Sequence, residues 1–312
     1  MRVLIKFFLL FLTLNLLSCS SSKSVVTKTI YNDYSTFRAQ QKSFVSADGI
    51  LKYSDIGEGK PILLIHGVPT SSWAYRKMIK SLSANGFRVI APDMLGFGSS
   101  ASPDGYDVYS HKNHGKRILA LMESLGIKNW NHVLHDAGGF WSYEMLKLAP
   151  NKVNNLIFLN TLIFEEGFNP PIKMKEGGAA KISMWAYRNG ITTKMILNNF
   201  FKMSLNDKKI PKSVKEGYKK PLREKKTKGM YYFFTQTSKP FPNYSSLFQS
   251  LKMPKLLIWG KHDNMLQIEP QKEKIIKELN IRPSDLHLLD ASHLLMEEKA
   301  EEITDLIKKF IK

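Results

Sequence analysis

The sequence predicts an α/β fold, with a mostly parallel sheet of eight strands, helices on both faces and a helical cap inserted above one edge. Short apolar runs alternate with longer helical patterns over most of the chain, as in proteins whose parallel strands are joined by helices. The run Pro61–His66 is apolar up to its last residue, which is typical of a strand buried on both faces. From about Glu165 to Ser250 the alternation stops. This interruption predicts an insertion at the carboxyl end of the sheet, where ligands bind in open α/β folds.

Eight strands are expected from apolar or alternating runs bounded by turn residues. In chain order they are Ser43–Ala47, Ile50–Ile56, Pro61–His66, Phe87–Ala91, His132–Leu134, Leu156–Asn160, Lys255–Trp259 and Asp285–Leu289. Helical periodicity marks three segments of the core and two of the insertion, with further helices in the gaps. These five segments are Ser71–Asn85, Tyr109–Leu125, Ala300–Ile311, Ala180–Tyr187 and Thr192–Met203. The core is therefore expected over residues 43–164 and 251–312, and the cap over residues 165–250.

The first 18 residues resemble a secretion signal. Arg2 and Lys6 give it a charged start, and the apolar run Phe7–Leu17 is too short to span a bilayer as a stable helix. The segment ends in Leu-Leu-Ser-Cys, which resembles the lipobox of bacterial lipoproteins. That resemblance implies that Cys19 is acylated and becomes the mature N-terminus.

Cys19 is the only cysteine, so no disulfide can form within the chain, although the protein is expected to be exported. Membrane anchoring is the simplest explanation for a lone cysteine at this place. The alternative is an ordinary signal whose cleavage site contains a cysteine. Residues 19–42 are polar and aperiodic, and predict a tether between lipid and domain. By analogy with lipoproteins, Ser20 favours the outer membrane.

The formal net charge is +19, and much of it lies in the insertion. Between Pro171 and Pro240 there are 17 Lys and Arg residues against 4 Asp and Glu. A lysine-rich solvated surface explains this excess, and it is the interpretation that the sequence favours. The alternative is contact with anionic lipid head groups. Nucleic acid is not expected as a partner of an exported lipoprotein.

The segment Asn131–Gly139 predicts a sharp turn from a strand into a helix, with Asp136 at the turn and small residues after it. Such a turn holds one side chain up at the head of a sheet, and when that residue is serine it is the nucleophile elbow of hydrolases. A carboxylate gains little by attacking an acyl carbon. If it attacks an activated sp3 carbon, it forms an ester that water later cleaves. The sequence therefore predicts a hydrolase of electrophilic alkyl carbons.

Two further motifs accompany the elbow: His-Gly-Val-Pro-Thr-Ser-Ser-Trp at residues 66–73 and Ala-Pro-Asp-Met-Leu-Gly-Phe-Gly at residues 91–98. With them, residues 44–312 resemble the aspartate-nucleophile branch of the α/β-hydrolase superfamily, namely haloalkane dehalogenases and epoxide hydrolases. The cap matches poorly, because cap sequences vary widely in this superfamily.

Three side chains that follow apolar strands form the predicted catalytic set. Asp136 is the nucleophile, His293 the base that activates water, and Asp263 the acid that fixes the imidazole tautomer, in the chain order of α/β-hydrolases. The resemblance implies an oxyanion hole made by the backbone N–H groups of Val68 and Ala137. Each residue taken alone has another explanation, since aspartate also caps helices and forms turns.

The chain departs from haloalkane dehalogenases at the residues that bind the departing halide. These enzymes typically place a tryptophan directly after the nucleophile, where this chain has Ala137, and many have an asparagine in place of Val68. A halide in a dry pocket without donors is costly. Trp185 of the cap is a candidate replacement.

Epoxide hydrolases use two cap tyrosines that donate to the ring oxygen as the ring opens. Tyr231 or Tyr232 resembles the second of these, and Tyr187 or Tyr218 is a candidate for the first. The predicted substrate-binding residues of the cap are accordingly Trp185, Tyr218, Tyr231 and Tyr232.

The expected function is hydrolysis of a small apolar electrophile through a covalent Asp136 ester, with an epoxide slightly preferred. The alternatives are a haloalkane dehalogenase, a carboxylic ester hydrolase in which Asp136 acts as a base for water, and an inactive binding protein that has kept the fold. No cofactor is expected. No metal is expected either, because four further histidines show no metal-ligand spacing: His111, His114, His132 and His135.

Overall fold

The computed structural model describes residues 31–170, 173–206 and 209–311. The predicted signal peptide, residues 1–18, and the predicted acylation site Cys19 lie outside the described residues. Among the residues that are described, no helix is long and apolar enough to cross a membrane.

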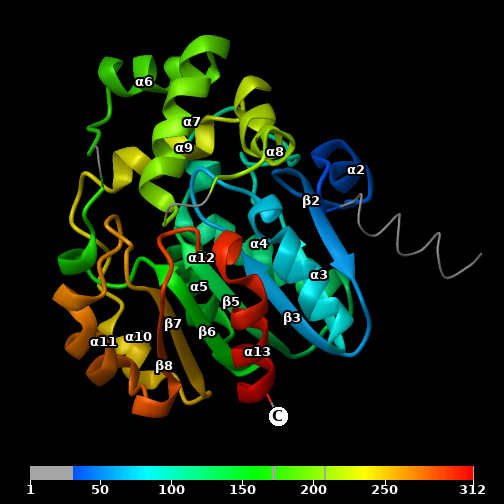
Figure 1. The fold of residues 1–312 in the computed structure, drawn as a ribbon, viewed down its shortest axis with the longest axis vertical. Helices are drawn as coiled ribbons and strands as arrows, with labels where there is room; N and C mark the ends of the chain where they lie inside the picture. Colours follow the sequence, from blue (N-terminus) through cyan, green and yellow to red (C-terminus); the bar gives the residue numbers. More distant parts are fainter. Residues whose placement is uncertain (1–30, 171–172, 207–208, 312) are drawn as a thin grey trace, which may run out of the picture.

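One sheet runs through the molecule (Figure 1). Its strands are β1 (Lys42–Ser46), β2 (Gly49–Ile56), β3 (Lys60–Ile65), β4 (Phe87–Pro92), β5 (Trp130–Asp136), β6 (Val153–Thr161), β7 (Lys255–Gly260) and β8 (Leu286–Leu289). They lie in the order β1-β2-β4-β3-β5-β6-β7-β8. β2 is antiparallel to both of its neighbours, and all other neighbouring strands are parallel. The predicted mostly parallel sheet of eight strands is confirmed.

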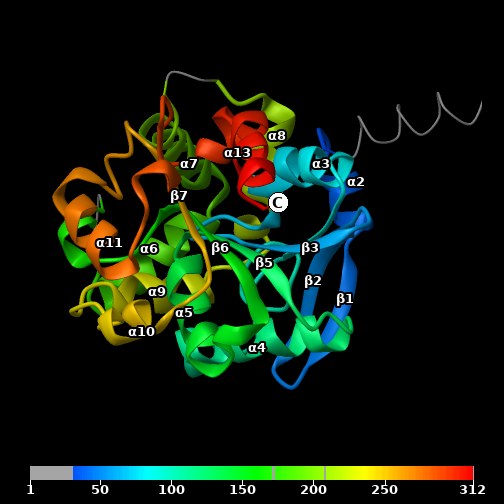
Figure 2. The same ribbon diagram turned by 90° about the horizontal axis from the view of Figure 1, so that it is seen from below.

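Helices cover both faces of the sheet. The helices outside the cap are α2 (Tyr34–Ala39), α3 (Arg76–Ala84), α4 (His111–Ser124), α5 (Gly138–Leu148), α10 (Ser245–Ser250), α11 (Lys272–Leu279), α12 (Leu295–Glu298) and α13 (Ala300–Phe310). Figure 2 shows α3 and α13 on one face and α4 and α5 on the other. The predicted helix Ser71–Asn85 differs at its start, where Ser72–Tyr75 is a 3-10 turn that leads into α3.

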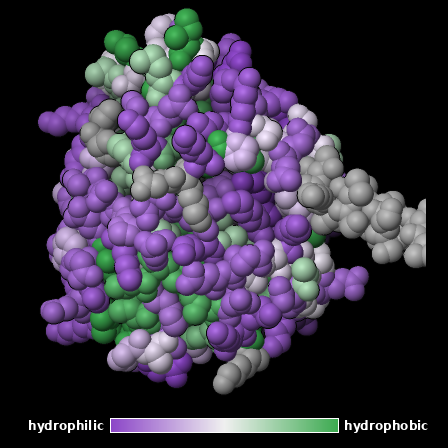
Figure 3. All heavy atoms as spheres, viewed as in Figure 1, coloured by the Kyte–Doolittle hydropathy of each residue, from purple (hydrophilic) through white to green (hydrophobic). Residues whose placement is uncertain are grey.

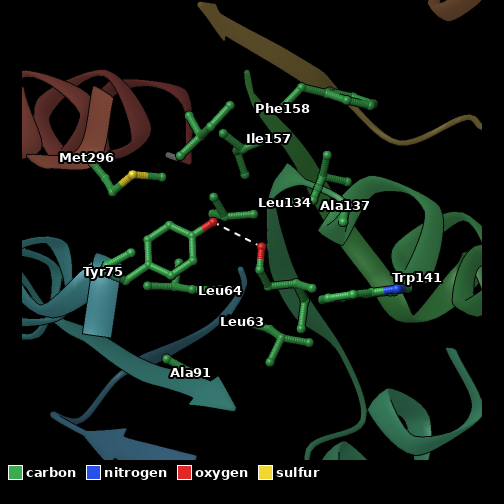
Figure 4. Packing of buried hydrophobic residues seen from close by; sticks show 14 of the residues in the cluster. Leu63, Leu64, Tyr75, Ala91, Leu134, Ala137, Trp141, Ile157, Phe158 and Met296 are labelled. Atoms are coloured by element: carbon green, nitrogen blue, oxygen red, sulfur yellow. Dashed lines mark hydrogen bonds between the residues drawn. The ribbon is translucent and has the colours of Figure 1, made fainter. Parts of the chain in front are cut away.

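The core lies between the central strands and these helices. Leu63, Leu64, Leu134 and Ile157 are fully buried, and burial of each such side chain stabilises the fold by about 1.5–3 kcal/mol. Figure 4 shows these side chains around Tyr75, whose hydroxyl donates to a carbonyl oxygen at the end of β3 at 3.0 Å. This packing gives the carboxyl ends of β3, β5 and β6 a rigid base.

Residues 31–42 do not form part of a tether, which corrects the predicted boundary. The Asp33 carboxylate accepts the Thr36 N–H at 2.7 Å and caps α2. Tyr34 and Phe37 of this helix are buried against Trp73, with ring centroids 5.3 and 5.1 Å away. Two aromatic side chains in six residues are enough to fix a short helix on the domain, a signal that the polar composition of the segment concealed.

The cap consists of α6 (Gly178–Arg188), α7 (Gly190–Ser204), α8 (Lys212–Arg223) and α9 (Lys228–Gln236), which lie together above the sheet in Figure 1. The two predicted cap helices correspond to α6 and α7. The predicted cap extends too far, because α10 lies beside α5 and α11 rather than with the cap helices. The rings of Phe248 in α10 and Tyr143 in α5 pack against each other with their centroids 4.9 Å apart.

Candidate active site

Asp136 stands at the sharp turn between β5 and α5. Its φ of +50° is a left-handed conformation that costs a non-glycine residue about 1–3 kcal/mol. Two glycines make room for the turn. A Cβ on Gly67 would lie 2.2 Å from Asp136 Oδ1, and a Cβ on Gly138 would lie 2.6 Å from the Ile65 carbonyl oxygen. The small residues at the elbow are therefore required by close packing.

The two oxygens of the Asp136 carboxylate have different surroundings. Oδ1 accepts the Val68 N–H at 2.6 Å, and the Ala137 N–H also donates to this carboxylate. Oδ2 faces His293 Nε2 at 3.8 Å, which is beyond hydrogen-bond range. Oδ1 is thus held by the Val68 amide, and Oδ2 is directed toward an imidazole without being bonded to it.

The loop that carries the Val68 amide is fixed by His66 and Asp93, residues of the two other motifs. His66 Nδ1 donates to the next carbonyl at 2.8 Å, and its Nε2 accepts the Met94 N–H at 2.9 Å. Asp93 accepts the Ser72 N–H at 2.9 Å and the Ser72 hydroxyl at 2.6 Å. The motifs at residues 66–73 and 91–98 therefore bind each other, and together they place the amide beside Asp136.

His293 follows β8 and is oriented by Asp263, which follows β7. His293 Nδ1 lies 2.8 Å from Asp263 Oδ2. Oδ1 of the same carboxylate accepts the N–H groups of Met265 and Leu266, both at 2.9 Å. Because both side chains are nearly fully buried, these bonds hold Nδ1 as the protonated nitrogen and leave Nε2 free to accept a proton on the side of Asp136.

Asn160, at the end of β6, is a site residue that the sequence did not reveal. Its Nδ2 donates to Asp263 Oδ2 at 2.9 Å and to the Ser292 carbonyl at 3.0 Å, while its Oδ1 accepts the Gly260 N–H at 2.7 Å. It also adopts a positive φ of +29°. Asn160 thus ties together the loops that carry the acid and the histidine. The available signal was a polar residue at the carboxyl end of a buried strand.

His135, directly before the nucleophile, supports the same loop. Its Nε2 lies 3.0 Å from the His293 carbonyl oxygen, and the two rings pack with centroids 4.8 Å apart. Burial lowers the pKa of His135 well below its usual value, so the ring is neutral and donates from Nε2.

Burial and charge act in opposite directions on the two facing groups. Burial raises the pKa of Asp136, and this effect outweighs the opposing effects of His293 and the two amides. Burial alone would lower the pKa of His293, but the Asp263 and Asp136 carboxylates outweigh it, so the net pKa is raised. Loss of the charge on Asp136 would remove one of the two carboxylates that stabilise the imidazolium.

A cavity of about 660 Å³ lies over Asp136 and His293. Its walls are mostly apolar and come from the cap and from the loops after the strands, including Phe168, Phe200 and Phe233. Cavities of this size with mostly apolar walls suit small apolar molecules. Within the described ranges, no cluster of three or more His, Cys, Asp or Glu side chains is arranged to hold a metal ion.

Trp185 does not line this cavity. It lies on the outer face of α6 with 55% of its surface exposed, so it is not placed to bind a departing halide. Val68 lines the cavity, whereas Ala137 is fully buried and does not, and neither side chain carries a hydrogen-bond donor. The cap residues that line the cavity and carry donors are instead Ser183, Tyr187, Asn199 and Lys202.

Of the tyrosines considered for the cap, Tyr187 lines the cavity, whereas Tyr218, Tyr231 and Tyr232 do not. The Tyr218 hydroxyl donates to Glu297 at 2.6 Å, in the contact between cap and core. Tyr231 and Tyr232 lie on α9, but their neighbours Phe233 and Phe234 are the residues directed into the cavity. The prediction of Trp185, Tyr218, Tyr231 and Tyr232 as substrate-binding residues is therefore not supported by their placement. Composition alone does not show which side of a cap helix faces inward.

Comparisons with known proteins agree with the fold and with the general class. The family model described as "alpha/beta hydrolase fold" matches residues 60–300. A cis-3-alkyl-4-alkyloxetan-2-one decarboxylase from Shewanella oneidensis is 27% identical over 87% of this chain and 88% of its own length. A haloalkane dehalogenase from Mycolicibacterium paratuberculosis is 26% identical over 82% of this chain and 86% of its own length.

Solved structures show the same architecture. A mutant of an epoxide hydrolase from Vigna radiata superposes with a TM-score of 0.72 at 18% identity, covering 87% of this chain and 98% of that one. At this identity the likeness concerns the fold alone. Because the family model spans most of the chain and the sheet has the expected order, the chain belongs to the α/β-hydrolase fold family.

Proposed function

We propose that this protein is a hydrolase in which Asp136 forms a covalent ester with an electrophilic carbon of a small apolar substrate. One observation carries the proposal. At the floor of an apolar cavity, Oδ1 of Asp136 accepts the Val68 N–H and the Ala137 N–H also donates to the carboxylate, while Oδ2 faces an imidazole nitrogen 3.8 Å away.

The first step uses the free oxygen. Oδ2 attacks the substrate carbon, the bond from that carbon to its leaving atom breaks, and the bonding pair goes to the leaving atom. The Val68 and Ala137 N–H groups then polarise the carbonyl of the new ester, which contains Oδ1. Esterification also removes the negative charge of Asp136 from the vicinity of His293.

The second step uses His293. Its Nε2 takes a proton from a water molecule, and the resulting hydroxide attacks Cγ of the ester. The negative charge that develops on Oδ1 is stabilised by the two amides. The intermediate collapses with loss of the former Oδ2 as the product alkoxide, which takes the proton back from His293. The second proton of the water is left on the re-formed Asp136 carboxyl group, and it neutralises the base that the first step released, so that the carboxylate is restored. The oxygen from water stays in Asp136.

An epoxide is the substrate class that the cavity favours. The ring oxygen needs a proton donor as it opens, and Tyr187 presents a phenol in the cavity wall. Burial raises the pKa of Tyr187, so it remains a neutral donor. A haloalkane is less favoured, because the positions directly beside the nucleophile, Val68 and Ala137, carry no side-chain donor for the halide and Trp185 lies outside the cavity.

Ring opening of a 3,4-dialkyl oxetan-2-one is a second candidate. Its leaving group is a carboxylate, which is a weak base and needs little protonation, and two alkyl chains suit an apolar cavity of this size. The 27% identity to the oxetanone decarboxylase over most of both chains supports it. Tyr187→Phe separates the two: epoxide turnover falls by about 10²-fold or more, whereas oxetanone turnover stays within about threefold.

The test of the reaction path is a single turnover in H₂¹⁸O with enzyme in excess over an epoxide. The expected result is an unlabelled product and one ¹⁸O in the peptide that contains Asp136. Label in the product after the first turnover indicates direct attack by water, with Asp136 as a base, and contradicts the proposal. Asp136→Ala is the control; if ester hydrolysis survives in it, that activity uses another nucleophile.

A further inference from the structure

The outer face of the cap carries an unusual concentration of exposed apolar side chains. Ile182 and Trp185 of α6 are 68% and 55% exposed, and Ile191 and Met195 of α7 are 77% and 62% exposed. In each helix the two residues are spaced three or four apart, so they share one face. At the top of Figure 3, hydrophobic side chains protrude over α6 and α7 among hydrophilic neighbours.

Basic side chains surround this face. From residue 178 to residue 204 the sequence has four basic residues and no aspartate or glutamate. Three of the four, Lys181, Arg188 and Lys194, are exposed on the same two helices, and the fourth, Lys202, is exposed nearer the C-terminus of α7. An exposed tryptophan and aliphatic side chains flanked by cations match the surface of a bilayer that contains anionic lipid.

The opposite faces of the same helices line the active-site cavity. Ser183 and Tyr187 of α6 and Ile196 and Phe200 of α7 contribute to its wall. The exposed apolar face and the cavity are therefore separated by the thickness of one helix layer. A substrate dissolved in the bilayer would lie close to the site when this face touches the membrane.

We propose that α6 and α7 form a membrane-docking face, with Ile182, Trp185, Ile191 and Met195 inserted among the acyl chains and Lys181, Arg188 and Lys194 on anionic phospholipid head groups. The positive charge, the lack of acidic residues and the single exposed tryptophan select this partner over a second copy of the chain, whose matching face would carry the same positive charge. The proposal does not depend on the chemistry of Asp136.

Tryptophan fluorescence tests this face directly. The chain has five tryptophans, and the four others are buried in the core: Trp73, Trp130, Trp141 and Trp259. Full-length protein with Cys19→Ser, which removes the predicted acylation site, is mixed with vesicles of equimolar phosphatidylcholine and phosphatidylglycerol whose acyl chains are brominated. The expected result is a blue shift and quenching of the Trp185 emission. Trp185→Phe removes both effects.

The charges are tested by Lys181→Gln, Arg188→Gln and Lys194→Gln together. Vesicle affinity at low salt is expected to fall roughly 100-fold. The matched control is Lys277→Gln, Lys308→Gln and Lys309→Gln, on α11 and α13, which changes the net charge equally but lies away from the cap; its affinity should change less than about threefold.

Three results overturn the proposal. The first is unquenched emission from protein that is bound to the brominated vesicles. The second is equal quenching in the Trp185→Phe protein. The third is a blue shift of Trp185 that needs no lipid and grows with protein concentration, which shows that another copy of the chain covers the face. The quenching of the parent protein is informative even if a triple variant fails to fold.

Discussion

Asp263→Asn is the perturbation whose effect the geometry defines most closely. In the native protein the N–H groups of Met265 and Leu266 both donate to Asp263 Oδ1 at 2.9 Å, and the oxygen of the new amide can accept the same two hydrogen bonds. Its NH₂ group then faces His293 Nδ1 and the NH₂ group of Asn160. Nδ1 must become an acceptor, so the proton moves to Nε2, and Nε2 no longer accepts a proton from water. Hydrolysis of the ester is expected to slow by about 10³–10⁴-fold.

The same change has a cost in stability. Two NH₂ groups cannot bond each other, and a buried donor left without an acceptor costs about 1–3 kcal/mol. Formation of the Asp136 ester does not need His293 as a base, so the ester is expected to accumulate. Stopped-flow kinetics and intact-mass measurement follow the two steps separately.

The matched control for this variant is Asp290→Asn. Asp290 also lies 2.8 Å from a histidine nitrogen, that of His262, but both side chains are largely exposed and lie outside the cavity. Turnover should stay within about twofold. If Asp263→Asn keeps turnover within tenfold of the parent, or slows formation and breakdown of the ester equally, the assignment of Asp263 is wrong.

Three further predictions concern other parts of the site. Breakdown of the ester needs neutral His293, so the rate of breakdown should fall as the pH decreases. The pKa of His293 is raised in the free enzyme, in part by the Asp136 carboxylate, and the ester no longer carries that charge. The fall in rate should therefore occur at a lower pH than the titration of His293 in the free enzyme, which NMR can follow. Gly67→Ala places a Cβ 2.2 Å from Asp136 Oδ1 and should reduce turnover at least 10²-fold, whereas Gly178→Ala, where a Cβ meets nothing within 4 Å, should not. Tyr218→Phe removes a hydrogen bond between cap and core and should lower the free energy of unfolding by about 1–2 kcal/mol while leaving kcat unchanged. A loss of kcat without a loss of stability would instead show that Tyr218 takes part in the reaction.

The sequence predicted the sheet well because a buried parallel strand leaves an apolar run that little else produces. Pro61–His66 and Lys255–Trp259 correspond to β3 and β7 with small shifts at the ends. The elbow at Asp136 was equally visible, since a left-handed residue packed against neighbouring loops needs small residues close by. These features depend on local geometry, which short stretches of sequence encode.

The cap and the supporting residues were less predictable because they depend on packing between distant segments. Tyr218 looked like a candidate for the cavity, but its hydroxyl finds Glu297, which lies 79 positions away. Asn160 lies at the end of an ordinary buried strand. Its role in joining the loops after β7 and β8 depends on contacts with residues more than 100 positions away, which the sequence does not show. The short helix α2 depends on contacts of Tyr34 and Phe37 with Trp73.

The central claim is that the Asp136 carboxylate becomes bonded to substrate carbon, and intact-mass measurement of His293→Gln tests it most directly. With the base removed, a single turnover of an epoxide should add the mass of one substrate molecule to the protein, and peptide mapping should place the added mass on Asp136. The His293→Gln, Asp136→Ala double variant should show no addition. If His293→Gln stays unmodified by epoxides and oxetan-2-ones that the parent enzyme turns over, Asp136 does not act as the nucleophile.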